Sequence, residues 1–163
     1  MNRSRRVRSE RGAAVVEFAL LVPVLCMLLF GIISFGIVFA NDLAMGNGAR
    51  EAARFGVVDG RDCNALFTDA RDASSSINVT NTAVQVTVYR GATKAAAKAA
   101  APICSVSFAN SVTNGTVKPC AGSTSGDVIY VLVEYHAKLV IPLAVVDPDF
   151  PVSGEGIFRC EFS

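Results

Sequence analysis

The chain has 163 residues and a formal net charge of +1, which leaves room for one membrane segment and one modest domain rather than a multidomain enzyme. Apolar residues make up 52% of the chain and charged residues 18%, but the apolar excess is concentrated near the N-terminus. After residue 40 there are ten basic and twelve acidic side chains, without a basic stripe suited to phosphate backbones. Nucleic-acid binding is therefore not expected.

A basic leader opens the chain. It contains one acidic residue, Glu10, and five arginines: Arg3, Arg5, Arg6, Arg8 and Arg11. Positive charge beside a membrane segment stays in the cytoplasm. We therefore predict a cytoplasmic N-terminus and an extracytoplasmic domain after about residue 40.

Residues 18–40 form an uninterrupted run of 23 uncharged, mostly apolar residues. As a helix this run extends about 35 Å, enough to cross a bilayer. A cleavable secretory signal has a shorter apolar core followed by its cleavage site, whereas here the cleavage-like feature precedes the run. The run predicts a single-pass transmembrane helix.

A carboxylate lies at the start of this segment, where Glu17 follows Gly12 by five residues. A charge at the centre of a membrane helix costs about 2.5–3.5 kcal/mol, and less near the interface, so Glu17 requires a partner or a role. Cleavage after Gly12 creates an ammonium at Ala13, one helical turn from Glu17, and the two charges neutralise each other. The alternative is an interfacial acid beside an ordinary loop glycine. Pro23 predicts a kink, either as a place that bends during assembly or as a plain transmembrane proline.

Two stretches carry a family resemblance. Residues 11–23, Arg-Gly-Ala-Ala-Val-Val-Glu-Phe-Ala-Leu-Leu-Val-Pro, and residues 29–36, Leu-Phe-Gly-Ile-Ile-Ser-Phe-Gly, resemble the opening of the TadE-like family, which comprises minor pilins or pseudopilins of tight-adherence, type IVb-like pili. Residues 48–54 and 158–161 carry weaker likenesses. The family often has an acid where this chain has Ser34.

The resemblance implies a minor pilin or pseudopilin that takes part in pilus assembly and cell adhesion. It implies cleavage between Gly12 and Ala13 by a prepilin peptidase, with N-methylation of Ala13, and roles in assembly for Glu17, Phe18 and Pro23. The implied partners are other pilin subunits, the pilus assembly platform and the bacterial inner membrane. A signal-anchored extracytoplasmic binding module unrelated to pili is the alternative.

The pattern predicts an α+β, pilin-like fold in three parts: a cleaved leader at 1–12, a transmembrane and extended helix at 13–57, and an extracytoplasmic domain at 58–163. Gly46 and Gly48 weaken the long helix and allow a bend. A small antiparallel sheet is expected to pack on this helix. The further elements expected are helices at 63–76 and 92–101, strands at 84–88, 103–108, 128–137 and 157–162, a loop at 110–127, an apolar extension at 139–146 and a turn at 147–151.

Four cysteines follow the membrane run: Cys63, Cys104, Cys120 and Cys160. In an oxidising compartment they allow two disulfides in three connectivities. We expect Cys104 with Cys120 and Cys63 with Cys160. A zinc site is the alternative, but no two of these cysteines have the close spacing that zinc sites use, so no metal is expected. Cys26, inside the membrane run, is expected to be a small buried apolar residue.

Catalytic chemistry has one weak candidate. Glu134 and His136 lie two residues apart on one strand face, as an acid and base pair could, although such a face is far more often solvated or structural. The chain has one histidine and lacks a phosphate-binding glycine loop. We therefore expect a non-enzymatic protein without a cofactor.

Overall fold

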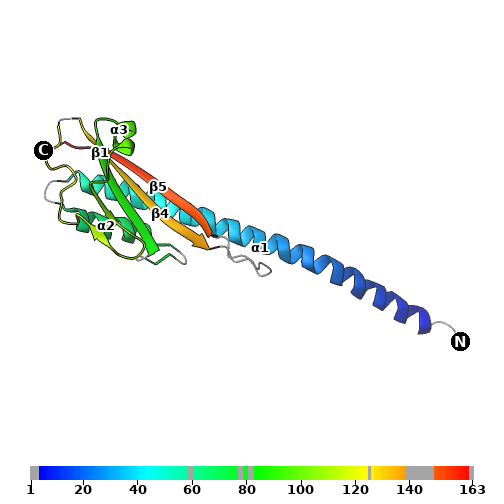
Figure 1. The fold of residues 1–163 in the computed structure, drawn as a ribbon. Helices are drawn as coiled ribbons and strands as arrows, with labels where there is room; N and C mark the ends of the chain where they lie inside the picture. Colours follow the sequence, from blue (N-terminus) through cyan, green and yellow to red (C-terminus); the bar gives the residue numbers. More distant parts are fainter. Residues whose placement is uncertain are drawn as a thin grey trace. The chain divides into compact units, whose positions relative to one another are not determined.

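The computed structural model of the chain describes residues 4–58, 61–76, 79–80, 83–124, 126–138 and 149–161. A long helix is followed by a small antiparallel sheet with two short helices, which confirms the predicted α+β class (Figure 1). The chain divides into two compact units, and the division of α1 falls between Gly36 and Ile37. Each unit is described here by itself.

Helix α1, Ser4–Gly56, is the only described helix long and apolar enough to cross a membrane, over Gly12–Gly56. Only 6% of its most apolar window is buried within the chain, so this window does not form the core of a globular domain. We expected the helix to begin at Ala13, but it begins earlier, because the leader contains no proline or glycine before Gly12 to interrupt it. The helix also continues through Gly46 and Gly48 without a break.

The second unit contains the end of α1 and all the remaining elements. Their bounds are α2 Cys63–Ala73, β1 Val84–Gly91, α3 Lys94–Ala99, β2 Cys104–Val106, β3 Val112–Thr113, β4 Val128–Lys138 and β5 Asp149–Arg159. The strands form one sheet in the order β3-β2-β1-β4-β5, and each neighbouring pair is antiparallel.

Local sequence explains both short helices. The side chain of Asp62 caps α2 by accepting a hydrogen bond from the Ala65 amide at 2.9 Å. Thr93 caps α3 in the same way, through the Ala96 amide at 3.2 Å. Helix α3 ends at Ala99, before Pro102, as expected from the restriction that proline places on the preceding residues.

The core of the second unit lies between the sheet and the helices. On β4 the alternating face predicted from the sequence is confirmed as buried: Ile129, Val131, Val133, Tyr135 and Ala137. The same core contains buried residues of α2. It also contains Met45, Ala49, Ala52 and Ala53 of α1 and Val84, Val86 and Val88 of β1.

Some of the expected elements differ from the structure. The loop at 110–127 contains the short strand β3, and the turn expected at 147–151 is wrong from Asp149 onward, because β5 begins there. Strand β5 is longer than expected because it pairs with β4 along its whole length, from Asp149 opposite Lys138 to Arg159 opposite Val128. The apolar extension expected at 139–146, Asp147, Pro148 and Phe162 lie outside the described residues.

Candidate functional site

The predicted processing and assembly residues all lie on α1 within its first unit. Gly12 is exposed, and a Cβ atom placed on it would meet nothing within 4 Å. Phe18 is 68% exposed, and Pro23 lies inside the helix. The apolar side chains around them face outward, since Val15, Leu20, Leu21, Leu25 and Leu29 are all at least half exposed. A single chain leaves this surface uncovered.

Helical spacing separates the roles of Gly12 and Glu17. Residues four apart share a helix face, so Ala13 and Glu17 are neighbours one turn apart, whereas Gly12 lies on a different face. Glu17 is exposed and forms no ion pair with any residue that the structure describes. The geometry therefore leaves its carboxylate available to a cation at Ala13 or on another chain.

In the second unit, glycines allow α1 to touch its neighbours through the backbone. A Cβ atom on Gly48 would meet Ser74 and the Ala70 carbonyl oxygen of α2. On β5, Cβ atoms on Gly154 and Gly156 would meet the backbone at Met45 and Ala49. The sequence prediction missed these two strand glycines, although glycines two apart in a strand signal close backbone approach on one face.

The outer face of the sheet is covered in part by α3, which is attached through Glu155. This carboxylate accepts hydrogen bonds from the ammonium groups of Lys94 and Lys98 at 2.6 Å each, and from the Tyr130 hydroxyl at 2.8 Å. Donors to the charged form stabilise it, and Lys94 contributes most, so the pKa of Glu155 falls to about 2. The hydrogen bond to Glu155 raises the pKa of Lys98, while burial raises that of Tyr130.

Arg71 of α2 connects the start of β1 with the turn between β2 and β3. Its guanidinium donates to the Val84 carbonyl at 2.9 and 3.0 Å, to the Ser107 carbonyl at 3.2 Å and to the Asn110 side chain at 2.7 Å. Partial burial lowers the pKa of Arg71. A planar group with several donors suits this three-way contact, which is structural in character.

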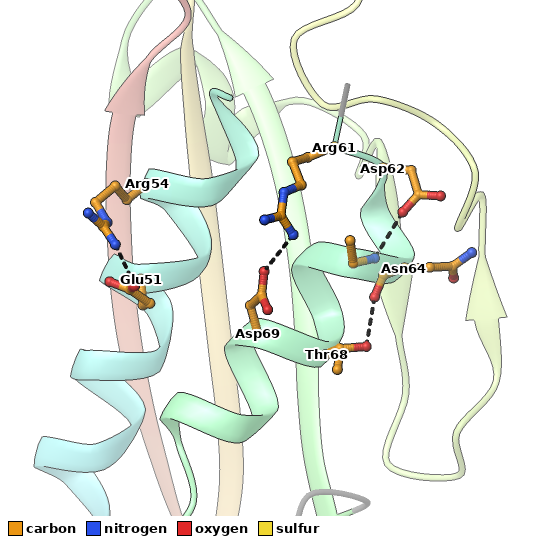
Figure 2. A network of polar contacts seen from close by, with 8 residues as sticks. Glu51, Arg54, Arg61, Asp62, Asn64, Thr68 and Asp69 are labelled. Atoms are coloured by element: carbon orange, nitrogen blue, oxygen red, sulfur yellow. Dashed lines mark hydrogen bonds and ion pairs between the residues drawn. The ribbon is translucent and has the colours of Figure 1, made fainter. Parts of the chain in front are cut away.

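A second polar network covers the end of α1 and the exposed side of α2 (Figure 2). Figure 2 shows Arg61 reaching Asp69 and Arg54 reaching Glu51, at 3.6 Å and 2.8 Å. The guanidinium groups of Arg54 and Arg61 also lie over the Phe55 ring, 5.2 and 5.1 Å from its centre. These contacts join the two helices at the surface.

The disulfide pairing predicted from the sequence is wrong. The structure joins Cys63 to Cys104 and Cys120 to Cys160. The order of strands in the sheet explains why Cys63 does not reach Cys160. Helix α2, which carries Cys63, lies on the β2 side of the sheet, whereas Cys160 follows β5, and β1 and β4 separate the two sides. Cys63 begins α2, which packs on β1 and β2, so it meets Cys104 instead.

The prediction that Cys26 is buried is also wrong within the single chain, because Cys26 is a free cysteine on the exposed surface of α1. No described part of the chain covers it.

The side chains of the acid and base candidate have separate neighbours. Glu134 accepts a hydrogen bond from the Gln85 amide at 3.1 Å, and the His136 ring lies edge-on to Phe108 with the ring centres 4.9 Å apart. In the described parts of the chain, no group of three or more His, Cys, Asp and Glu residues is arranged to hold a metal ion. These contacts of Glu134 and His136 are thus with different residues of the sheet surface and not with each other.

Comparison with known proteins gives one match. Residues 12–54 match the family of TadE-like proteins, which confirms the resemblance inferred from the sequence. The match covers α1 from Gly12 almost to its end. No curated protein and no solved structure matches the chain.

Proposed function

We propose that this chain, whose residues 12–54 are TadE-like, is a minor pilin or pseudopilin that takes part in assembling a tight-adherence pilus. The carrying observation is the family match over an exposed apolar helix that contains Gly12 and Glu17. The match over residues 12–54 supports a pilin-like protein associated with such pili. The proposed role is structural and not enzymatic.

Processing after Gly12 by a prepilin peptidase is the first step of the proposal. From Ser4 onward the leader is helical and continuous with the membrane segment. Cleavage after Gly12 removes the arginines and leaves Ala13 as the new amino terminus. Its ammonium then lies one turn from the Glu17 carboxylate, and mutual neutralisation lowers the cost of a charge at the membrane. The same pairing between adjacent subunits aligns their helices with an axial offset.

The exposed apolar surface of α1 supports the second step. In the bilayer this surface contacts lipid, and in a helical bundle it contacts other pilin subunits at the assembly platform. Small residues such as Gly31 and Gly36, which meet nothing within 4 Å in the single chain, allow close approach of a neighbouring helix. The proposed location is the bacterial inner membrane, with a cytoplasmic N-terminus and the C-terminal domain outside.

N-terminal sequencing of the protein coexpressed with a prepilin peptidase tests the processing step. We expect the mature chain to start at Ala13, and Gly12→Val to abolish cleavage because the peptidase must accommodate this position closely. Gly36→Val is the matched control, since it makes the same change at an exposed glycine of the same helix and should leave cleavage intact. An intact Met1 terminus, or equal cleavage of both variants, would refute processing after Gly12.

A helix exchange separates a pilin from a membrane-tethered binding module. Residues 18–40 are replaced by an unrelated apolar helix of equal length while Gly12 and Glu17 are kept. A pilin loses assembly, measured as the amount of pili sheared from cells that otherwise make them. Unchanged piliation would favour the tethered module.

A further inference from the structure

The sheet has two very different edges. Strand β3 closes one side with two residues, whereas β5 closes the other with eleven, from Asp149 to Arg159 (Figure 1). Long edge strands present rows of main-chain donors and acceptors that can pair with another chain. Proteins usually shorten, bend or cover such an edge, so an open β5 requires an explanation.

The ladder shows which groups of β5 face outward. Cys160 donates its amide to the directly opposite Asp127 carbonyl at 2.8 Å, which makes this a hydrogen-bonded pair in the register that β4 and β5 follow. Hydrogen-bonded and non-hydrogen-bonded pairs alternate in antiparallel sheets. The even-numbered residues of β5 therefore bond to β4, and the main-chain groups of the odd-numbered residues point away from it.

Pro151 supports this assignment. It is an odd-numbered residue of β5, opposite His136, and proline in a sheet is confined to positions where the missing amide would face solvent. The outward amides are thus those of Ser153, Glu155, Ile157 and Arg159. The alternation leaves these four amides unpaired with β4, within the described ranges they donate no backbone hydrogen bond outside the strand ladders, and all four residues are exposed.

The side chains beside this edge define what could dock there. The Glu155 carboxylate is already paired with the ammonium groups of Lys94 and Lys98 and accepts a hydrogen bond from the Tyr130 hydroxyl. Ile157 and Phe158 are 38% and 40% exposed, and Arg159 is exposed without an ion pair in the described part of the chain. The edge therefore offers two apolar side chains and one uncompensated cation.

We infer that the β5 edge binds an extended segment of a different protein by strand addition, with an apolar residue beside Ile157 and a carboxylate within reach of Arg159. Main-chain hydrogen bonds from residues 153–159 provide the binding, and these two side chains provide the selectivity. The inference is independent of the proposed pilus function. It requires only the edge of the exported sheet.

A second copy of the chain fits this edge less well. Gly154 touches the α1 backbone at Met45 and Gly156 touches it at Ala49, so β5 runs in the same direction as these turns of α1. Antiparallel pairing of two β5 strands would set Arg159 of one copy beside earlier residues of the other, where the Glu155 carboxylate is already held by two lysines. Parallel pairing would bring the two Arg159 side chains together, so a strand of another protein that carries a carboxylate is favoured.

Amide hydrogen exchange of the full-length protein in detergent micelles tests the inference. The probes are two blocked heptapeptides of alternating valine and threonine, one carrying a single glutamate and the other a lysine at the same position. In the free protein we expect the amides of Ser153, Glu155, Ile157 and Arg159 to exchange at least about ten-fold faster than those of residues 152, 154, 156 and 158, since only the latter are paired. The glutamate peptide should slow the four outward amides at least about ten-fold, with weaker protection by the lysine peptide.

Two variants make the test specific. Ile157→Pro removes one outward amide without removing a bond to β4 and should weaken peptide binding at least about ten-fold, whereas Ile157→Val keeps the amide and an apolar β-branched side chain and is the matched control. Arg159→Gln should abolish the preference for the glutamate peptide while keeping binding of both. Retained protection by β4 of the amides of residues 152, 154, 156 and 158 verifies that each variant is folded. If Ile157→Pro fails this check, the peptide preference of Arg159→Gln is the deciding measurement.

Three results would overturn the inference. The first is no protection of the outward amides by either peptide. The second is protection that rises with protein concentration in the absence of peptide, which would identify a second copy as the occupant. The third is an unchanged peptide preference in Arg159→Gln. Cleavage after Gly12 is measured separately, so none of these results bears on the pilus proposal.

Discussion

Glu155 shows how one residue joins helix α3 to two strands of the second unit. Its carboxylate lies on the outer face of β5 and receives two lysine ammonium groups from α3 and the Tyr130 hydroxyl from β4. Lys94 and Lys98 also lie over the Tyr130 ring, 5.9 and 5.0 Å from its centre. Helix α3 has only six residues, of which Ala97 is buried, so these polar contacts add to its attachment to the sheet.

Acid titration should reveal this contact. The pKa of Glu155 is about 2 in the folded chain against an ordinary value of 4.5, so the folded state prefers the ionised form. The stabilisation is complete above about pH 4.5 and is lost as the pH falls toward 2. Because 37% of the side chain is exposed, solvent screening makes the effect smaller than the shift alone implies.

We therefore expect the wild type to lose more stability than Glu155→Gln between about pH 4.5 and pH 2, measured by urea unfolding at several pH values. Glu134→Gln is the matched control, since the Glu134 carboxylate contacts the neutral amide of Gln85. Parallel pH profiles for the wild type and Glu155→Gln would contradict the assigned contact.

At the scale of elements, helix α1 and strand β5 pack with almost no separation. Gly154 and Gly156 face the backbone of α1 at Met45 and Ala49, and the buried apolar side chains of this part of α1 are those of Met45, Ala49, Ala52 and Ala53. Larger side chains on either surface would force the two elements apart. The close approach therefore depends on the glycines of β5 and on the alanines of α1.

Gly154→Ala should lower the free energy of unfolding by at least about 1–3 kcal/mol, because its Cβ would overlap the backbone at Met45, which cannot rotate away. Gly46→Ala is the control. A Cβ there would meet nothing within 4 Å, and alanine should stabilise the helix by about 0.5–1 kcal/mol. Thermal unfolding followed by circular dichroism measures both, and equal effects would show that β5 does not pack on α1 as described.

Most elements were predictable because their signals are local. The period of β4, the proline after α3 and the apolar run of α1 depend on neighbouring residues alone. The length of β5 was not predictable, because Pro151, Gly154 and Gly156 disfavour a strand by local preference. Pairing with β4 and contact with α1 override that preference.

At the scale of the whole molecule, two disulfides join segments that are distant in the sequence. Cys63–Cys104 lies in the main core and spans 41 residues, while Cys120–Cys160 belongs to a smaller cluster with Ile129 and spans 40 residues. Loops of nearly equal length imply nearly equal chain-entropy contributions, about 4 kcal/mol each. Any difference between the two bonds must therefore come from their surroundings.

We expect replacement of both Cys63 and Cys104 by alanine to destabilise the protein more than replacement of both Cys120 and Cys160. The first pair is 0% and 1% exposed inside the core, so its removal leaves a larger unfilled space. Urea unfolding of the two double variants measures the difference, and peptide mapping without reduction checks the pairing. Detection of Cys104 joined to Cys120 would contradict the structure.

The sequence by itself determined the features that depend on local chemistry: the basic leader, the apolar helix with Gly12 and Glu17, the α+β class and the alternating face of β4. Only the tertiary structure decided the order of the strands, and with it the cysteine pairing, the contact of Gly154 and Gly156 with α1 and the open edge at β5. The physical reason is that these features join residues far apart in the chain. Their geometry depends on which faces pack together, and no local pattern encodes that choice.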